Sequence, residues 1–170
     1  MTGKNRGVSQ LRRTVVPQAR AWSRLVPRGS SHGAGLSARV RRLVFARAFG
    51  FCEGCGTSVI GRPYSIAPRL EQGADGTSRP EADAVWNLVL LCGSAASPGG
   101  CSLLCEQRDP DMHDRGMWLS PEESPRRVPL SLFNAEGPRI RAWLNDEGTY
   151  DLAADSSEHP WLFCTDSAVR

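Results

Sequence analysis

The chain has 170 residues, a net charge of +3, 17 glycines and 12 prolines. This length suits one small domain with extensions, and domains of that size are often stabilised by metal ions or disulfides. The chain has no apolar run near the ~18 residues that cross a membrane and no secretory signal, so we expect a cytoplasmic protein with no membrane partner. Its six cysteines would then be reduced, and close pairs of reduced cysteines are typical metal ligands.

The basic residues are concentrated at the start of the chain. Residues 1–52 contain eleven basic side chains and no acidic one, whereas the remainder contains ten arginines and eighteen acids. An acid-free basic segment predicts a partner that carries phosphates, and we expect a nucleic acid. The alternative is a solvated arm that only keeps the protein in solution.

The first predicted element is a helix from Ser37 to about Phe49. Ser37 is a suitable cap, apolar residues recur at helical spacing from Val40 to Val44, and Gly50 ends the helix. A tight turn over 51–56, a strand over 63–70 and a loop over 71–84 follow. Residues 86–92 form a short apolar run that we expect to be buried.

The second half of the chain mixes helix and strand. We predict a helix over 101–115, interrupted near Pro110 and ended by Gly116, and a strand over 128–133. Residues 139–144 and 149–152 flank Asn145-Asp146-Glu147-Gly148 and indicate a β-hairpin. The predicted organisation is therefore α+β, with a basic arm at 1–36, a compact module at 37–120, a hairpin extension at 121–152 and an acidic tail at 153–170.

Four cysteines have the spacing of a structural zinc site. Cys52 and Cys55 form a C-x2-C turn, and Cys92 and Cys101 flank a glycine-rich loop. Two such pairs suit tetrahedral zinc, whose binding would contribute much of the folding free energy of a small core. Cys105 lies one helical turn past Cys101 and is the alternative fourth ligand. We favour Cys101, because ligands usually lie where the loop meets the helix. Cys164 has no obvious partner.

The order of these motifs resembles the HNH endonuclease family, in the form common in phages of actinobacteria. The matching features are a helix, the C-x2-C turn, Tyr64-Ser65-Ile66, a glycine-rich loop, the run from Asn87 to Gly93, Gly100-Cys101, a helix and a hairpin. The resemblance covers about residues 37–150. It implies a ββα-metal, treble-clef-like fold with a structural zinc beside a separate catalytic divalent metal.

The resemblance fails at the catalytic residues. The family has a metal ligand on the first strand, a histidine base next to it and a second ligand, histidine, early on the helix, an arrangement suited to phosphodiester hydrolysis. This chain has Ala67, Pro68 and Ser102 at those places, whereas Asn87 and Arg69 match the family. We call Ala67, Pro68 and Ser102 the nuclease positions. None can supply a good ligand or a base at neutral pH, so we predict no catalytic metal and no cleavage.

Three functions follow from these residues. The first is an inactive HNH-type module that binds nucleic acid, with double-stranded DNA expected, through the arm and phosphate contacts from Arg39, Arg41, Arg42 and Arg69. The second is an active nuclease with non-standard ligands such as Glu106, Asp109 and Asp111. The third is a structural or protein-interaction component of a phage or actinobacterial system, whose partner surface is the acidic C-terminal half: Asp146, Glu147, Asp151, Asp155, Glu158 and Asp166.

Overall fold

The computed structural model of the chain describes residues 35–71, 81–133 and 138–152. Its order is α2 (Ala38–Arg47), β1 (Tyr64–Pro68), the 3-10 turn η2 (Val85–Asn87), β2 (Leu88–Cys92), α3 (Gly100–Glu106), α4 (Pro110–Asp114), β3 (Leu130–Leu132), β4 (Ile140–Leu144) and β5 (Tyr150–Leu152). The expectation of a mixed α+β architecture is confirmed. Nearly all of the predicted arm and the whole acidic tail lie outside the described residues. No helix in the described ranges is long and apolar enough to cross a membrane.

Helix α2 begins where its sequence predicts. The Ser37 hydroxyl accepts a hydrogen bond from the Val40 backbone N–H at 3.2 Å, which satisfies one of the free donors at the start of the helix. Val44 and Phe45 are buried on the inner face. Phe49 and Gly50 then have positive φ, 51° and 71°, and this left-handed turn ends the helix.

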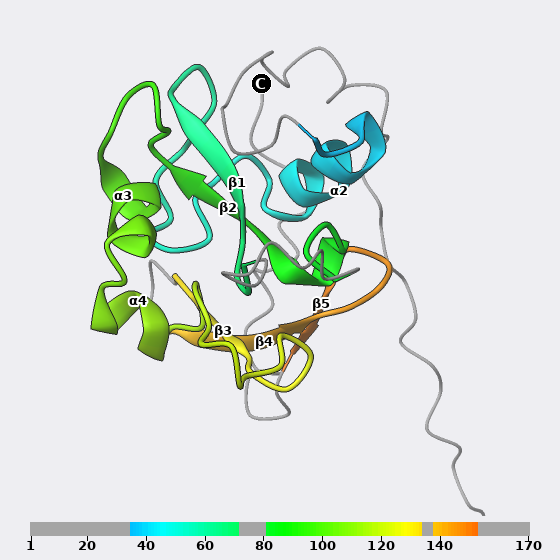
Figure 1. Cartoon of the computed structure of the whole chain (residues 1–170). Helices are drawn as coiled ribbons and strands as arrows, with labels where there is room; N and C mark the ends of the chain where they lie inside the picture. The colour runs from blue at the N-terminus through cyan, green and yellow to red at the C-terminus, as the bar shows by residue number, and fades with distance from the viewer. Residues whose placement is uncertain (1–34, 72–80, 134–137, 153–170) are drawn as a thin grey trace, which may run out of the picture.

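Strands β1 and β2 form an antiparallel pair at the centre of the molecule. Tyr64 pairs with Cys92 at one end of the pair, and Pro68 pairs with Leu88 at the other. Figure 1 shows α2 and α3 on either side of this pair, and both helices pack against β2. The C-x2-C turn that follows α2, from Cys52 to Cys55, is called the knuckle below. The strand pair therefore positions the knuckle and the start of α3 around one end of β2.

The predicted helix over 101–115 is two helices, α3 and α4. The Asp109 carboxylate accepts from the Met112 backbone N–H at 3.2 Å, and Pro110 occupies the first turn of α4. Proline lacks the N–H that a continuous helix would need but fits a first turn. The interruption predicted near Pro110 is confirmed, and Gly116, with φ of 69°, follows α4 as expected.

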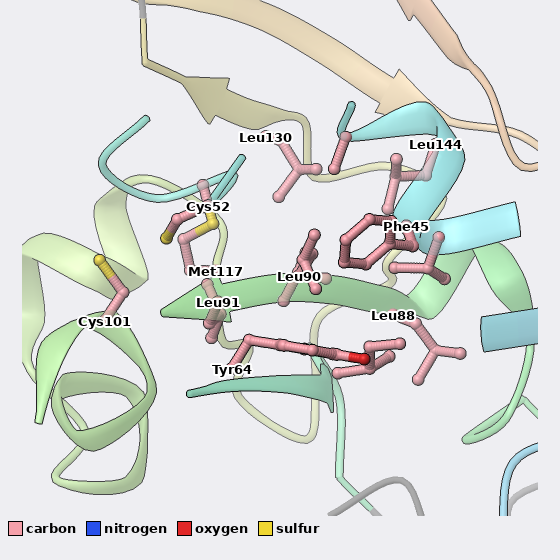
Figure 2. Packing of buried hydrophobic residues seen from close by; sticks show 14 of the residues in the cluster. Phe45, Cys52, Tyr64, Leu88, Leu90, Leu91, Cys101, Met117, Leu130 and Leu144 are labelled. Carbon is pink, nitrogen blue, oxygen red and sulfur yellow. The ribbon is translucent and has the colours of Figure 1, made fainter. Parts of the chain in front are cut away.

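The hairpin extension is a three-stranded antiparallel sheet in the order β3-β4-β5. The predicted hairpin is confirmed, because Leu144 pairs with Tyr150 across the turn. The inner face of this sheet joins the same core as β2: Leu130 and Leu144 approach Leu90 and Phe45 in Figure 2. The extension is thus part of the single hydrophobic core and helps to cover β2.

Candidate metal centre

Four cysteine sulfurs meet at the end of β2. The Sγ atoms of Cys52, Cys55, Cys92 and Cys101 all lie within 4.8 Å of one another, and Cys55 Sγ is 3.6 Å from Cys92 Sγ. A tetrahedral zinc with Zn–S bonds of ~2.3 Å has sulfurs about 3.8 Å apart. The cluster therefore has the composition and size to hold a metal ion such as zinc, as the sequence predicted.

Backbone turns bring the sulfurs together from three segments. In the knuckle, the Cys52 N–H donates to Thr57 O at 2.9 Å and the Gly56 N–H donates to Cys52 O at 2.8 Å. Gly100 begins α3 with φ of 62°, and a Cβ there would lie 2.6 Å from Cys92 Sγ. A side chain at position 100 would therefore collide with a ligand as well as strain the backbone.

Hydrogen bonds and burial shift the pKa values of three of the four thiols. Hydrogen bonding with Cys101 and with backbone amides lowers the pKa of Cys52 to about 5. The same bond and burial raise the pKa of Cys101, and burial raises that of Cys92 to about 11. Cys92 Sγ also accepts the Cys101 backbone N–H at 3.3 Å. Such amide bonds stabilise thiolates, and a bound cation would deprotonate all four thiols.

The fifth described cysteine lies apart from the four sulfurs. Cys105 is 9% exposed, stands outside the four-sulfur group, and burial raises its pKa to about 12. The structure thus groups Cys101, and not Cys105, with the other three cysteines, and Cys105 packs in the core as a small apolar residue. Cys164 lies outside the described residues.

A buried ion pair that the sequence analysis did not predict anchors the knuckle. Glu53 lies between the first two cysteines, and its Oε1 accepts a hydrogen bond from Arg47 Nε at 3.0 Å. Both side chains are 2% exposed. The Leu90 N–H donates to Glu53 Oε2 at 2.5 Å, and the Tyr150 hydroxyl donates to Oε1 at 2.5 Å. Arg47 also donates to Val85 O and Leu88 O. This network ties α2, the knuckle, β2 and β5 together, so it holds two ligands in place.

The nuclease positions carry no metal-binding group in the structure either. Ala67 and Pro68 are half-buried on β1, and Ser102 is 4% exposed. Ser102 Oγ accepts a hydrogen bond from Ser65 Oγ at 2.8 Å, so its hydroxyl is engaged between β1 and α3. Asn87, which matches the family, bonds the backbone of Leu70 in both directions at 2.9 Å and fixes the chain just beyond β1.

Two of the acids considered as non-standard metal ligands make other contacts in the structure. Asp109 caps α4, and Asp111 pairs with Arg115 one turn later. Within the described ranges, the four cysteines are the only group of three or more His, Cys, Asp or Glu side chains close enough to share an ion. His113 Nε2 lies 2.8 Å from Glu123 Oε2, and its ring packs against the ring of Trp118. It is not a member of the four-cysteine group.

The prediction that Arg69 contacts phosphate is wrong. Arg69 is fully buried, and its guanidinium donates to three backbone carbonyls, those of Gly116, Pro125 and Val128. Burial lowers its pKa to about 10, which still leaves it charged at neutral pH. Arg69 therefore organises the segment between α4 and β3 from inside, where no phosphate can reach it.

The arginines predicted on α2 have the opposite placement. Arg39 and Arg42 are exposed and Arg41 is half-buried. The first turn of α2 contains no acidic residue, so its outer face is positively charged. Comparisons of the chain with family models, with curated proteins and with solved structures each found no match.

Proposed function

We propose that this chain is a zinc-stapled module of the HNH ββα-metal type that binds nucleic acid, with double-stranded DNA as the expected partner, and does not cleave it. The observation that carries the proposal is the contrast between a complete four-sulfur cluster and nuclease positions without ligand or base. The cell compartment that fits best is the cytoplasm, where thiol ligands stay reduced.

Zinc is the metal that the donor set favours. All four donors are thiols, and soft thiolate ligands in a tetrahedral group select zinc among the divalent ions that are abundant in cells. With four protein ligands the site is closed, leaving no position for water or substrate. The metal would therefore stabilise the fold and take no part in hydrolysis.

The binding surface that we propose is the outer face of α2 together with the basic arm. Arg39 and Arg42 are exposed three residues apart on one side of the helix, while Val44 on the opposite side is buried. The preceding arm carries Lys4 and six arginines within residues 1–35. Arginines of this kind contact phosphates and position a protein on DNA without reading sequence.

The lack of cleavage follows from the chemistry of the nuclease positions. A metal-assisted hydrolase needs ligands for a cation beside the scissile phosphate and a base for the attacking water. Ala67 and Pro68 have no such group, and the Ser102 hydroxyl is buried and bonded to Ser65. The nuclease positions therefore offer no site for the family's catalytic metal.

The test of binding is the salt dependence of affinity for a DNA duplex. Non-specific affinity of about 10⁻⁴–10⁻⁶ M at physiological salt is expected, with log K falling by about 0.9 per phosphate contact for each unit of log salt. The double variant Arg39→Gln/Arg42→Gln should reduce that slope by up to about 2 units. The control Arg127→Gln/Arg141→Gln removes two exposed arginines outside α2 and should leave the slope near that of the wild type. Equal slopes in both variants would exclude α2 as the phosphate-contacting face.

A further inference from the structure

Three large apolar side chains are exposed together where α2 meets the knuckle. Phe49 is 39%, Phe51 48% and Ile60 42% exposed, and we call these three residues the apolar patch. The Ile60 side chain lies over Gly50, because Ile60 Cγ1 is 2.9 Å from the place where a Gly50 Cβ would be. The Val59 N–H donates to Gly50 O at 2.9 Å. Ile60 therefore lies beside the segment that carries Phe49 and Phe51.

The patch is built at a conformational cost and has a cationic rim. Phe49 has φ of 51°, a left-handed conformation that non-glycine residues rarely adopt. Arg42 is exposed one helical turn before Phe45, and Phe45 Cε1 lies 3.4 Å from the place where a Gly50 Cβ would be. Arg62 is exposed just after Ile60, in a turn closed by the bond from its N–H to Val59 O at 3.1 Å. A ligand for this surface needs apolar groups with acids beside them.

The last part of the described chain lies beside α2. Leu43 Cβ lies 3.3 Å from the place where a Gly148 Cβ would be, and the Arg47 guanidinium lies 5.8 Å from the centre of the Tyr150 ring. The turn before β5 and the first residue of β5 therefore lie beside α2.

The residues after Leu152 have the composition that the patch requires. Residues 153–170 contain the apolar run Trp161-Leu162-Phe163, flanked by acids at Asp155, Glu158 and Asp166. Eight residues separate Leu152 from Trp161, and the chain between them spans up to about 30 Å when extended. The arm at the other end of the chain also has apolar residues, but they lie among arginines, which the rim of the patch repels.

We propose that Trp161-Leu162-Phe163 docks on the apolar patch, with the flanking acids beside Arg42 and Arg62. The apolar contact supplies the binding free energy, and the opposite charges fix the orientation of the tail. Docking places acids next to Arg42, which is one of the proposed phosphate contacts. The tail is then a competitor of nucleic acid, and this consequence, unlike the docking itself, rests on the proposed function.

The natural cysteine next to Phe163 provides the test. In the full-length, zinc-loaded chain, Ile60→Cys places a thiol in the patch, and a short bismaleimide can link it to Cys164. Leu104→Cys is the matched control, since Leu104 is 38% exposed but lies on α3. We expect the link between position 60 and Cys164 to form at least about tenfold faster than the link from position 104, because docking adds to the effective concentration that the shared tether gives both variants.

A second change separates docking from simple proximity. Adding Trp161→Ala to the Ile60→Cys chain should reduce its cross-linking to the control rate. In the otherwise unaltered chain, the backbone amides of residues 161–164 should exchange with solvent more slowly than in a Phe51→Asp variant. Equal cross-linking rates at positions 60 and 104, together with equal amide exchange, would overturn the proposal. A link formed only between two chains would also overturn it, by identifying a second copy as the occupant.

Discussion

The metal centre and the nuclease positions lie on the same β1–β2–α3 unit, yet their surroundings differ completely. At the Tyr64–Cys92 end of the strand pair, four sulfurs converge and a buried ion pair supports the turn that carries two of them. The three nuclease positions lie on β1 and at the start of α3. Their only polar side-chain group is the Ser102 hydroxyl, which is hydrogen-bonded to Ser65. The comparison teaches that this chain assembles a complete four-sulfur group although its nuclease positions offer neither a good metal ligand nor a base.

Loss of one ligand should have the largest effect. Cys52→Ser is expected to bind no zinc and to be unfolded or aggregated, because structural zinc contributes ~10–16 kcal/mol of apparent binding free energy in zinc-finger peptides, and that energy is folding energy. Metal analysis and circular dichroism of the purified protein measure both effects. Cys105→Ala is the control and should retain one zinc per chain. A wild-type protein that is metal-free and fully folded would refute the proposal that zinc stabilises the fold.

Removal of the charge of Glu53 should have the next largest effect. Glu53→Gln leaves Arg47 buried without its counterion, and breaking a buried pair in this way costs about 3–5 kcal/mol. Urea unfolding of the zinc-loaded protein gives the change in the free energy of unfolding. Glu71→Gln disrupts an exposed pair with Arg108 and should change stability by only ~0–1 kcal/mol. Similar losses in the two variants would mean that the Glu53 network does not support the knuckle.

A smaller effect is expected at the nuclease positions. Ser102→Ala leaves Ser65 without its buried partner, at a cost of about 1–3 kcal/mol, whereas replacing both serines with alanine should be close to neutral. A double-mutant cycle by chemical denaturation measures this coupling. Additive losses from the two substitutions would show that the serines do not depend on each other and that the bond between them contributes little.

The sequence predicted the parts of this molecule that depend on local rules. The cap at Ser37, the break before Pro110 and the hairpin around Asn145 each depend on a few adjacent residues. The four cysteines that the spacing selects also lie together in the structure. A C-x2-C turn and a cysteine at the junction of a loop and a helix constrain the backbone on their own. These features need little information from distant parts of the chain.

The parts that sequence reasoning missed depend on contacts between distant residues. Tyr150 reaches Glu53 across 97 positions, and nothing near either residue indicates that contact, although an acid between two cysteine ligands was a usable signal for Glu53. Nothing near Arg69 in the sequence indicates its burial, and arginine is seldom fully buried. Three carbonyls from a segment 47 to 59 residues away make its burial possible.

Incubation of supercoiled plasmid with the zinc-loaded chain and added Mg²⁺, Mn²⁺ or Ni²⁺ tests the central claim most directly. On an agarose gel, the plasmid should migrate more slowly as protein is added, because the protein binds through phosphate contacts. After detergent treatment it should return entirely to the supercoiled form, because the nuclease positions provide neither metal ligand nor base. Accumulation of open-circular plasmid that requires the divalent ion would contradict the account.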